Sequence, residues 1–496
     1  MSDPAARALP AAGGPETPMT ADAASDDAAT AVISLYQKHK KIYPRSVQGL
    51  FVRWRWALVW ITQIIFYGLP WLQWNDRQAL LFDLGSRRFY IFGSVLYPQD
   101  FIFLTGLLVI SALALFLFTA VAGRLWCGYA CPQTVYTEMF MWIERRIEGD
   151  RVARMRLDGS PWNLNKIWRK SAKQAAWIVL ALYTGFTFVG YFTPIRTLWA
   201  EAFTLGFGPW EWFWVNFYAF ATYGNAGFMR EQVCKYMCPY ARFQSAMFDK
   251  DTLIISYDRE RGEPRGSRSR KADPKQLGLG DCINCNLCVQ VCPTGIDIRK
   301  GLQYECIGCA ACIDVCDDVM DRMNYPRGLV RYGTQNAMAK HYTRKEIVSH
   351  ALRPRVLIYG GILSAVAVAL IVGMALRSPF KVNVVRDRVS LARLVEEGQI
   401  ENLYRLQIMN SAERPQRYQV SVAGLPGIVL AAPVDVKLEA AEARWVTVAV
   451  RVPPETARQA GPGAHPMAFD IELREDALAA GTGRTLHEKS TFVIPR

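Results

Sequence analysis

Long apolar stretches constrain the fold of this 496-residue chain more than any other feature. A helix needs about 20 mainly apolar residues to cross a bilayer, and Phe101–Ala122 and Val356–Leu376 meet this requirement without one charged residue. Two of the three further stretches are interrupted by Gln63 and Pro70 or by Asn216 and Asn225, and buried helices of a large soluble protein are the alternative for all three. Trp and Tyr crowd the ends of these stretches, which favours the membrane. We expect five transmembrane helices: Trp56–Trp74, Phe101–Ala122, Ala175–Thr193, Trp212–Met229 and Val356–Leu376.

The positive charge of the chain, a net +14 at pH 7, is distributed unevenly around these stretches. Ten Lys and Arg residues lie in Arg124–Gln174 and many more in Arg230–Arg355, whereas Asn75–Asp100 has three and Pro194–Glu211 has one. Six more lie in the segment directly before the first stretch: Lys38, Lys40, Lys41, Arg45, Arg53 and Arg55. Because Lys and Arg are enriched in cytoplasmic connections, we expect the N-terminus and both basic connections in the cytoplasm and the tail after Leu376 outside. Topology then accounts for the charge, and no nucleic-acid partner is expected.

The last 120 residues, Arg377–Arg496, have a different pattern, in which short segments alternate apolar and polar side chains between turn-forming residues. Short strands at this spacing predict a β-sandwich of immunoglobulin-like type. The expected strands are Lys381–Arg386, Tyr404–Met409, Arg417–Val422, Val434–Leu438, Trp445–Val452 and Ala468–Leu473. This segment has no cysteine, so a disulfide or thiolate metal site is excluded, and we expect a binding or docking module.

All twelve cysteines lie between Cys127 and Cys316, and eight of them form two runs with the spacing C-x2-C-x2-C-x3-C. In two-cluster ferredoxins such a run supplies three ligands to one [4Fe-4S] cluster, and its fourth cysteine ligates the other cluster. The first cluster is therefore expected on Cys282, Cys285, Cys288 and Cys316, and the second on Cys306, Cys309, Cys312 and Cys292. Structural zinc uses one or two C-x2-C pairs rather than two runs of four, and disulfides are disfavoured in the cytoplasm.

The remaining four cysteines form an internal repeat, C-x-Y-x-C-P, which follows the second and the fourth apolar stretch. The pairs are Cys127 with Cys131 and Cys234 with Cys238. A spacing of four predicts that both sulfurs of a pair lie on one helical face, with the proline ending or kinking the helix after them. Four converging thiols suit Cu(I), another soft metal centre or dithiol–disulfide exchange. Burial as small packing residues is the alternative, but the repetition favours a functional site.

Several cofactors are excluded by what the chain lacks. It has five histidines, none within an expected span, so paired-histidine haem b is excluded, and no C-x-x-C-H motif exists for haem c. No dinucleotide-binding or Walker A motif is present, so no flavin, nicotinamide or nucleotide site is evident. Electrons must come from a partner, either a quinol or a soluble donor. We expect the basic stretch Arg259–Lys275 to be a solvated linker attracted to anionic lipid.

Together these segments resemble the cytochrome c oxidase accessory proteins called CcoG, FixG or RdxA. The residues that carry the resemblance are Lys40–Arg45, Trp126–Thr134, Cys234–Arg242, Cys292–Arg299 and Asn383–Arg388. The resemblance implies a polyferredoxin of the bacterial inner membrane, with a periplasmic C-terminal domain, that assists assembly of the cbb-type haem-copper oxidase by reducing Cu(II) to Cu(I). It implies copper ions, copper chaperones and oxidase assembly factors as partners. The repeat thiols Cys127, Cys131, Cys234 and Cys238 are then expected to contact copper or relay electrons.

The expected fold class is therefore a multi-domain membrane protein with five transmembrane α-helices, a cytoplasmic ferredoxin-like domain with two [4Fe-4S] clusters and a C-terminal immunoglobulin-like β-sandwich. The expected parts are a disordered tail (1–37), a four-helix membrane region (38–250), a basic linker (251–280), the ferredoxin-like domain (281–326), a cytoplasmic connection (327–355), the fifth span (356–376) and the sandwich (377–496). Three other functions stay open: a quinol dehydrogenase feeding a periplasmic acceptor, a redox sensor and a structural assembly scaffold. The sequence does not define the oligomeric state.

Overall fold

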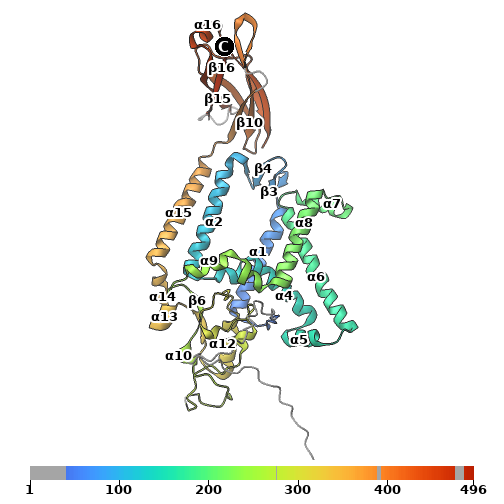
Figure 1. Ribbon diagram of the computed structural model, residues 1–496, viewed down its shortest axis with the longest axis vertical. Helices are drawn as coiled ribbons and strands as arrows, with labels where there is room; N and C mark the ends of the chain where they lie inside the picture. The colour runs from blue at the N-terminus through green and yellow to red at the C-terminus, as the bar shows by residue number, and fades with distance from the viewer. Residues whose placement is uncertain (1–40, 275, 388–391, 475–484, 496) are drawn as a thin grey trace, which may run out of the picture. The chain divides into compact units, whose positions relative to one another are not determined.

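The computed structural model describes residues 41–274, 276–387, 392–474 and 485–495 (Figure 1). The tail expected at 1–37 lies outside the described residues. The helices of the apolar region are α1 (Leu50–Gly68), α2 (Phe101–Ala122), α3 (Leu125–Tyr129), α4 (Pro132–Glu148), α5 (Arg151–Gly159), α6 (Leu164–Val189), α7 (Ile195–Thr204), α8 (Pro209–Thr222), α9 (Pro239–Met247) and α15 (Pro354–Ala375). Two π-helical segments, η3 (Tyr223–Met229) and η4 (Val233–Met237), follow α8.

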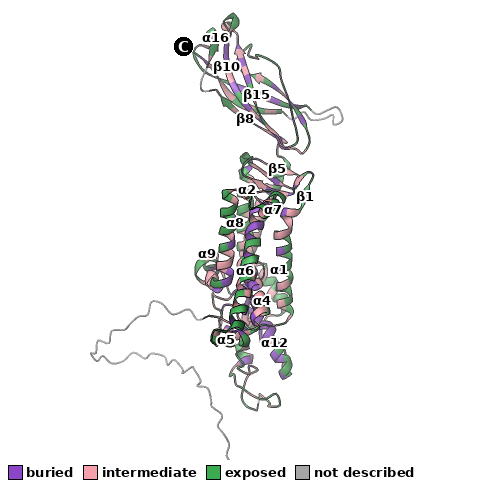
Figure 2. Ribbon diagram, turned by 90° about the vertical axis from the view of Figure 1, so that its right-hand side faces the viewer, coloured by how far each residue is buried: buried purple, intermediate pink, exposed green. Residues whose placement is uncertain are grey.

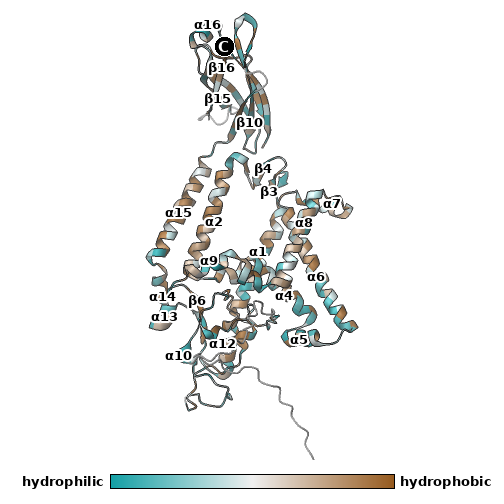
Figure 3. Ribbon diagram, viewed as in Figure 1, coloured by the Kyte–Doolittle hydropathy of each residue, from teal (hydrophilic) through white to brown (hydrophobic). Residues whose placement is uncertain are grey.

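Three helices in the described part of the chain are long and apolar enough to cross a membrane: Pro98–Ala122, Leu164–Val189 and Pro354–Ala375. None of the residues in the apolar windows of the first and third of these helices, which contain α2 and α15, is buried. Figure 2 colours much of α2 as exposed, and Figure 3 colours α2 and α15 largely as hydrophobic. The other two expected spans are helical but do not meet the same criterion. Helix α1 carries Arg53 and Arg55 near its start, and α8 is only 14 residues long before the backbone changes to η3. Five crossings therefore stay a prediction.

Helices α6 and α8 pack closely because glycine is present at their crossing. A Cβ atom on Gly185 of α6 would collide with the carbonyl oxygen of Val215 of α8. Beside this crossing, the fully buried ring of Trp177 packs on Phe140 of α4 and donates from its indole nitrogen to the Phe140 carbonyl at 3.1 Å. Helices α4, α6 and α8 thus share one core at the end of the bundle where the thiol repeat lies.

The connection between α1 and α2 contains strands that the alternation pattern did not predict. Strands β3 (Leu80–Asp83), β4 (Arg88–Ile91) and β5 (Ser94–Leu96) form an antiparallel meander, preceded by the short pair β1 (Gln73–Trp74) and β2 (Arg77–Gln78). Val95 is fully buried and Leu81 nearly so, and both belong to a small core that also includes Met409 of the C-terminal part.

The ferredoxin-type part begins earlier in the chain than the cysteine runs. Strand β6 (Ile254–Tyr257) pairs antiparallel with β7 (Val330–Gly333), around α10 (Arg259–Gly262), α11 (Leu287–Gln290), the 3-10 turn η5 (Ile298–Lys300) and α12 (Ala311–Met323). The segment expected as a solvated linker is therefore folded here: Arg261 pairs with Asp281 at 2.5 Å and Arg268 donates to the Tyr325 hydroxyl at 3.0 Å. Helices α13 (Gln335–Lys340) and α14 (Arg344–Ala351) lead to α15.

The C-terminal part is an antiparallel β-sandwich, which confirms the immunoglobulin-like prediction. One sheet has the order β12-β14-β10-β8, with β9 also paired to β10, and the other has the order β13-β11-β15-β16. The strands are β8 (Phe380–Arg386), β9 (Arg393–Leu394), β10 (Ile400–Asn410), β11 (Gln416–Ala423), β12 (Val429–Leu430), β13 (Val434–Leu438), β14 (Ala443–Val452), β15 (Gly463–Arg474) and β16 (Thr485–Ile494), with α16 (Pro454–Ala460) between β14 and β15. Each of the six expected strands lies within one of these.

Candidate metal centres

The structure brings the expected ligands of the first cluster to one place. Cys282, Cys285, Cys288 and Cys316 line a single open cavity of about 390 Å³. Its other walls are mainly apolar side chains of β6, α12, the loop before β7 and the start of β7: Tyr257, Val315, Val319, Met320, Leu329 and Val330. Cys285 is exposed and Cys282 is buried, so this site has one face toward solvent.

The expected ligands of the second cluster also share a cavity. Cys292, Cys306, Cys309 and Cys312 line an open space of about 330 Å³, and Cys288 of the first site lies in the wall of this second cavity. Each cavity thus takes its fourth cysteine from the other run, which is the crossed arrangement expected from the spacing. The ligand assignment itself stays a prediction, and the placement of the side chains is compatible with it.

The backbone explains why both runs wrap in the same way. In the first run Asn284 and Asn286 have left-handed φ angles of 54° and 56°, and in the second Gly308 and Ala310 have 69° and 58°. These pairs flank the second cysteine of their run, and α11 and α12 begin directly after them. Left-handed residues beside right-handed ones turn successive N–H groups toward one side, which forms the anion-binding concavity common in iron–sulfur sites.

Arg299 hydrogen-bonds to the loop of the first cysteine run, and the spacing of the cysteines did not identify it. Its guanidinium donates to the side-chain oxygens of Asn284 at 2.8 Å and Asn286 at 2.7 Å, and it also pairs with Asp297 at 2.7 Å. Arg299 is only 9% exposed, so this contact ties η5 to both left-handed asparagines of the cysteine loop. Only the two side-chain amides at alternate positions around Cys285 could have indicated such a partner.

The donor chemistry of both cavities suits iron–sulfur clusters. Burial raises the pKa of Cys288 to about 11 and that of Cys306 and Cys316 to about 12, so these thiols would be neutral at pH 7 without a cation. Bound iron removes such protons, because a metal is the largest local charge in its site and its thiol ligands ionise. Iron–sulfur clusters supply one-electron transfer when bound, and the cysteines named above would hold them.

The thiol repeat has a geometry different from the expected one. Cys127 lies in the short helix α3 and Cys234 in η4, but Cys131 and Cys238 are extended residues outside these helices, with φ and ψ of −61° and 129° and of −75° and 109°. The prediction of two sulfurs on one helical face is therefore wrong. The prolines explain the difference, because Pro is favoured at the first position of a helix, and Pro132 and Pro239 begin α4 and α9 rather than ending α3 and η4.

The four repeat thiols nevertheless lie within electrostatic range of one another. Each of the six pairs among Cys127, Cys131, Cys234 and Cys238 interacts electrostatically. The Cys127 thiol also lies 3.4 Å from the side-chain oxygen of Gln244 in α9, which belongs to the other half of the repeat. Burial raises the pKa of Cys127 to about 11 and that of Cys234 to about 12, so these thiols are protonated at neutral pH unless a cation binds them.

This thiol site touches the loop of the second ferredoxin-type cavity. A Cβ on Gly128 would stand 2.8 Å from the Cα and the backbone nitrogen of Cys309, and one on Gly308 would stand 3.0 Å from the carbonyl oxygen of Arg124. Both glycines are therefore required for the approach of these two backbones. Cys127 and Cys234 pack with Cys309 and Ile307 in one apolar cluster.

Arg124 connects the same elements. Its guanidinium donates to the carbonyls of Tyr304, in the loop before Cys306, and of Ala241 in α9. The residue is 5% exposed, and within the described chain its Nε atom is buried without a hydrogen-bond partner. Arg124 interacts electrostatically with Cys127, Cys234 and Cys306, so one cation serves both the thiol site and the second cavity.

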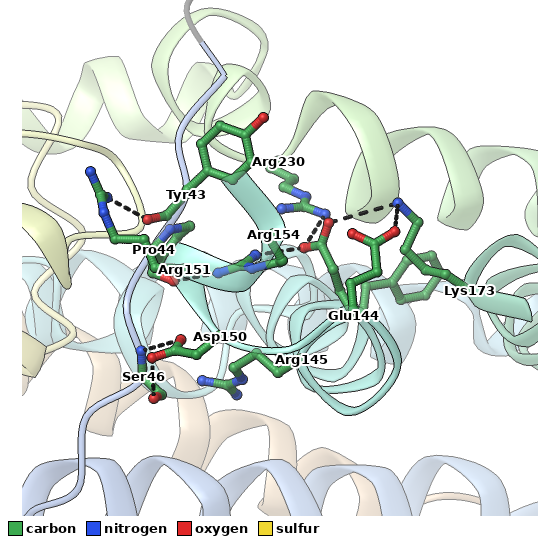
Figure 4. A network of polar contacts seen from close by, with 12 residues as sticks. Tyr43, Pro44, Ser46, Glu144, Arg145, Asp150, Arg151, Arg154, Lys173 and Arg230 are labelled. Carbon is green, nitrogen blue, oxygen red and sulfur yellow. Dashed lines mark hydrogen bonds and ion pairs between the residues drawn. The ribbon is translucent and has the colours of Figure 1, made fainter. Parts of the chain in front are cut away.

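A buried charge network joins α4, which follows the first thiol pair, to Arg230, which precedes the second (Figure 4). Glu144 of α4 accepts from Arg154 at 2.9 Å and from Arg230 at 3.0 Å, and Lys173 lies 3.8 Å away. Burial alone would raise the pKa of Glu144, but Arg230, Arg154 and Lys173 lower it below its usual value. Arg230 lies four residues before Cys234, so the network joins the start of the second motif to the helix that follows the first.

Comparisons with known proteins agree with this reading of the sites. A model described as a 4Fe-4S dicluster domain matches residues 229–335, one described as a 4Fe-4S binding domain matches 104–149, and one for the immunoglobulin-like fold at the C-terminus of FixG matches 370–495.

Curated relatives match most of the chain. The nitrogen fixation protein FixG of Rhizobium meliloti is 39% identical over 440 residues, which cover 82% of this chain and 84% of the relative. Protein RdxB of Cereibacter sphaeroides is 40% identical over 479 residues, covering 93% and 98%. Protein RdxA of the same organism is 39% identical, covering 79% and 84%. The crystal structure of a FixG-related protein from Vibrio parahaemolyticus aligns with 24% of this chain and 97% of its own at 21% identity and a TM-score of 0.20.

Proposed function

Since the chain belongs to the FixG/RdxA family of iron–sulfur electron-transfer proteins, we propose that it is an oxidoreductase that reduces Cu(II) to Cu(I) for assembly of a cbb-type haem-copper oxidase. Its electrons would enter at the exposed first cluster, pass to the second and leave at the four repeat thiols. The family and the 4Fe-4S domains support electron transfer and are consistent with an oxidoreductase. Copper and the oxidase are the proposed part.

The contact between the second cavity and the thiol repeat carries this proposal. The backbones of Gly128 and Cys309 meet without an intervening side chain, and Cys127 and Cys234 lie in the same packed cluster as Cys309. At the other end of the path, Cys285 is exposed and can face a donor. The two cavities adjoin at Cys288, and Cys309 of the second packs in one cluster with Cys127 and Cys234, so each site on the path borders the next.

Copper suits the chemistry at the end of this path. Thiolates are soft ligands that select Cu(I) over harder ions. The transfer is balanced with one electron, since one Cu(II) gains it and one ferredoxin-type cluster loses it, and a reduced quinol or soluble carrier then restores the cluster. The Cys127 and Cys234 thiols, neutral at pH 7 when free, would each release a proton on binding a metal centre.

The proposed setting is the bacterial inner membrane, with the N-terminus and the ferredoxin-type part in the cytoplasm and the sandwich in the periplasm. The three long apolar helices support a membrane location, and the distribution of Lys and Arg supports this orientation. The sandwich would then be the module that meets copper chaperones or oxidase assembly factors.

Cupric reduction can be measured directly on the anaerobically purified full chain. The protein is reduced, freed of excess reductant and mixed with Cu(II), and the Cu(I) formed is captured by a chelator specific for Cu(I). The variant with Ser at Cys127, Cys131, Cys234 and Cys238 is expected to lose this activity while about eight irons of the two ferredoxin-type clusters remain. Met237→Ser, an exposed change in the same segment, is the control and should keep full activity. Full activity in the fourfold variant would refute the proposed role of the thiols.

One observation favours quinol oxidation as a second candidate. An open cavity of about 500 Å³ lies beside Cys234 and is lined by Gln133, Thr137, Glu138 and Arg55. Glu138 is 4% exposed and pairs with Arg55 at 3.6 Å, so a carboxylate lies where a quinol would release a proton. Glu138→Gln should then slow quinol-dependent reduction of the clusters without changing their reduction by dithionite. Equal rates of quinol oxidation in the two proteins would exclude this site.

A further inference from the structure

The cysteine count of the two iron–sulfur matches leaves a complete ligand set unassigned. The dicluster match at 229–335 contains ten cysteines, eight of which line the two cavities, so Cys234 and Cys238 are left over. The separate 4Fe-4S match at 104–149 contains only Cys127 and Cys131, which are two ligands short of a cluster. The two cysteines left over in the first match would supply the two ligands that the second match lacks.

We propose that Cys127, Cys131, Cys234 and Cys238 together hold a third iron–sulfur cluster, which relays electrons between the ferredoxin-type part and the membrane region. Each half of the repeat supplies one thiol from a short helical segment and one from the residue that precedes a helix-initiating proline. The two halves thus present equivalent pairs, as expected for a cluster bound between two copies of one motif.

The surroundings of the four thiols fit a negatively charged cluster. Four thiolates and their sulfides need positive charge and N–H donors nearby, and Arg124 supplies both. Its Nε is a buried donor without a partner in the described chain, and a buried donor left unpaired is unfavourable. Arg124 interacts electrostatically with Cys127 and Cys234, so this donor lies near the thiols that would hold the cluster.

The position of the site distinguishes an iron–sulfur cluster from a structural metal. Zinc has no redox chemistry, and it would not need the backbone contact that Gly128 and Gly308 allow with the second ferredoxin-type cavity. That contact is required of a relay, in which one electron leaves a ferredoxin-type cluster, oxidising it, and reduces the third site. Of the two roles open to the repeat thiols, this assigns electron relay.

The test is a count of iron and acid-labile sulfide per chain in the anaerobically purified full-length protein, with spin quantitation by EPR after complete reduction. The wild type is expected to contain about twelve irons, four per cluster. The variants C127S/C131S and C234S/C238S should each contain about eight, because neither pair holds a cluster alone. Met237→Ser, exposed in η4, should keep the full count.

Several results would overturn the proposal. A count of about eight irons in the wild type would do so, even if the variants fail to fold. One molar equivalent of zinc or copper in the wild type that is lost in either cysteine-pair variant would also do so. A pair variant that keeps twelve irons would show that the two halves do not share a site. The iron count contains no copper and is independent of the assay for Cu(II) reduction. The third cluster can therefore be disproved while Cu(II) reduction is confirmed, and it can be confirmed while Cu(II) reduction is disproved.

Discussion

Replacing Glu144 by Gln tests whether the charge network of Figure 4 holds the two halves of the thiol repeat together. Gln keeps the shape of the side chain and removes its charge. Glu144 is 1% exposed, and its three cationic partners Arg154, Lys173 and Arg230 are all at least partly buried, with side-chain exposures of 2%, 6% and 11%. The variant therefore leaves several positive charges in a protein interior without their main counter-ion.

The size of the effect follows from this burial. Removing one partner of a buried ion pair costs about 3–5 kcal/mol, because the remaining charge is desolvated and uncompensated. Lys173 retains Glu148 at 2.9 Å, which keeps the expected loss within this range rather than above it. For a folding unit of 150–250 residues, each kcal/mol shifts the melting temperature by about 2–4 °C, so a decrease of about 6–20 °C is expected.

The assay is thermal unfolding of the detergent-solubilised protein, followed by the far-ultraviolet signal of its helices. The matched control is Asp318→Asn, which removes an exposed pair with Arg322 on α12, where the two side chains are 47% and 73% exposed. Exposed pairs of this kind contribute about 0.3–0.5 kcal/mol, so the control should melt within about 2 °C of the wild type. A Glu144→Gln protein that melts no lower than this control would refute the reasoning.

Three further predictions concern the same region. The difference in melting temperature between wild type and Glu144→Gln should narrow as the pH falls below about 4.5, the pKa of Glu144 in the unfolded chain. The pKa of Glu144 is lower in the folded protein, so the stability that the carboxylate gives is present above pH 4.5 and is lost as the carboxylate protonates. A constant difference down to pH 3 would contradict this. Gly128→Ala should slow oxidation of the reduced clusters by Cu(II) several-fold in stopped-flow absorbance, since its Cβ would displace the Cys309 backbone, whereas Gly159→Ala has open space and should match the wild type. Arg299→Lys should lose iron faster to a chelator, because an ammonium cannot bind both asparagines and the aspartate of the first cysteine loop in the planar fork; unchanged release would show that the loop needs no such clamp.

Local patterns predicted the sandwich and the grouping of the ferredoxin-type cysteines. Strand β10 alternates Tyr404, Leu406 and Ile408, all fully buried, with polar or partly exposed residues, and such alternation is a direct consequence of strand geometry. Each cavity is lined by three cysteines of one run and the fourth cysteine of the other, with Cys288 also in the wall of the second cavity, which is compatible with the two-cluster ferredoxin pattern.

Features that depend on distant contacts were not predictable. Proline at the end of each thiol motif is compatible with ending one helix or beginning the next, and only the fold shows that Pro132 begins α4. Arg299 meets its asparagines through the turn η5, and Gly128 meets Cys309 across more than 170 positions, so neither pairing leaves a local signature. The basic segment around Arg261 was assigned to solvent because its partners, Asp281 and the 326–327 carbonyls, are supplied by other loops.

The two halves of the thiol repeat are separated by more than a hundred residues, which gives any metal centre bound to both of them a second consequence. Such a centre is a cross-link that closes a very long loop. A cross-link of this length lowers the conformational entropy of the unfolded chain, which stabilises the folded state by about 4–5 kcal/mol. The ligand set is complete only after Cys238 has been synthesised, so the segment from α3 to α8 has already been made when the cross-link forms. Loss of the metal would then loosen the helix bundle itself as well as interrupt the path of the electrons.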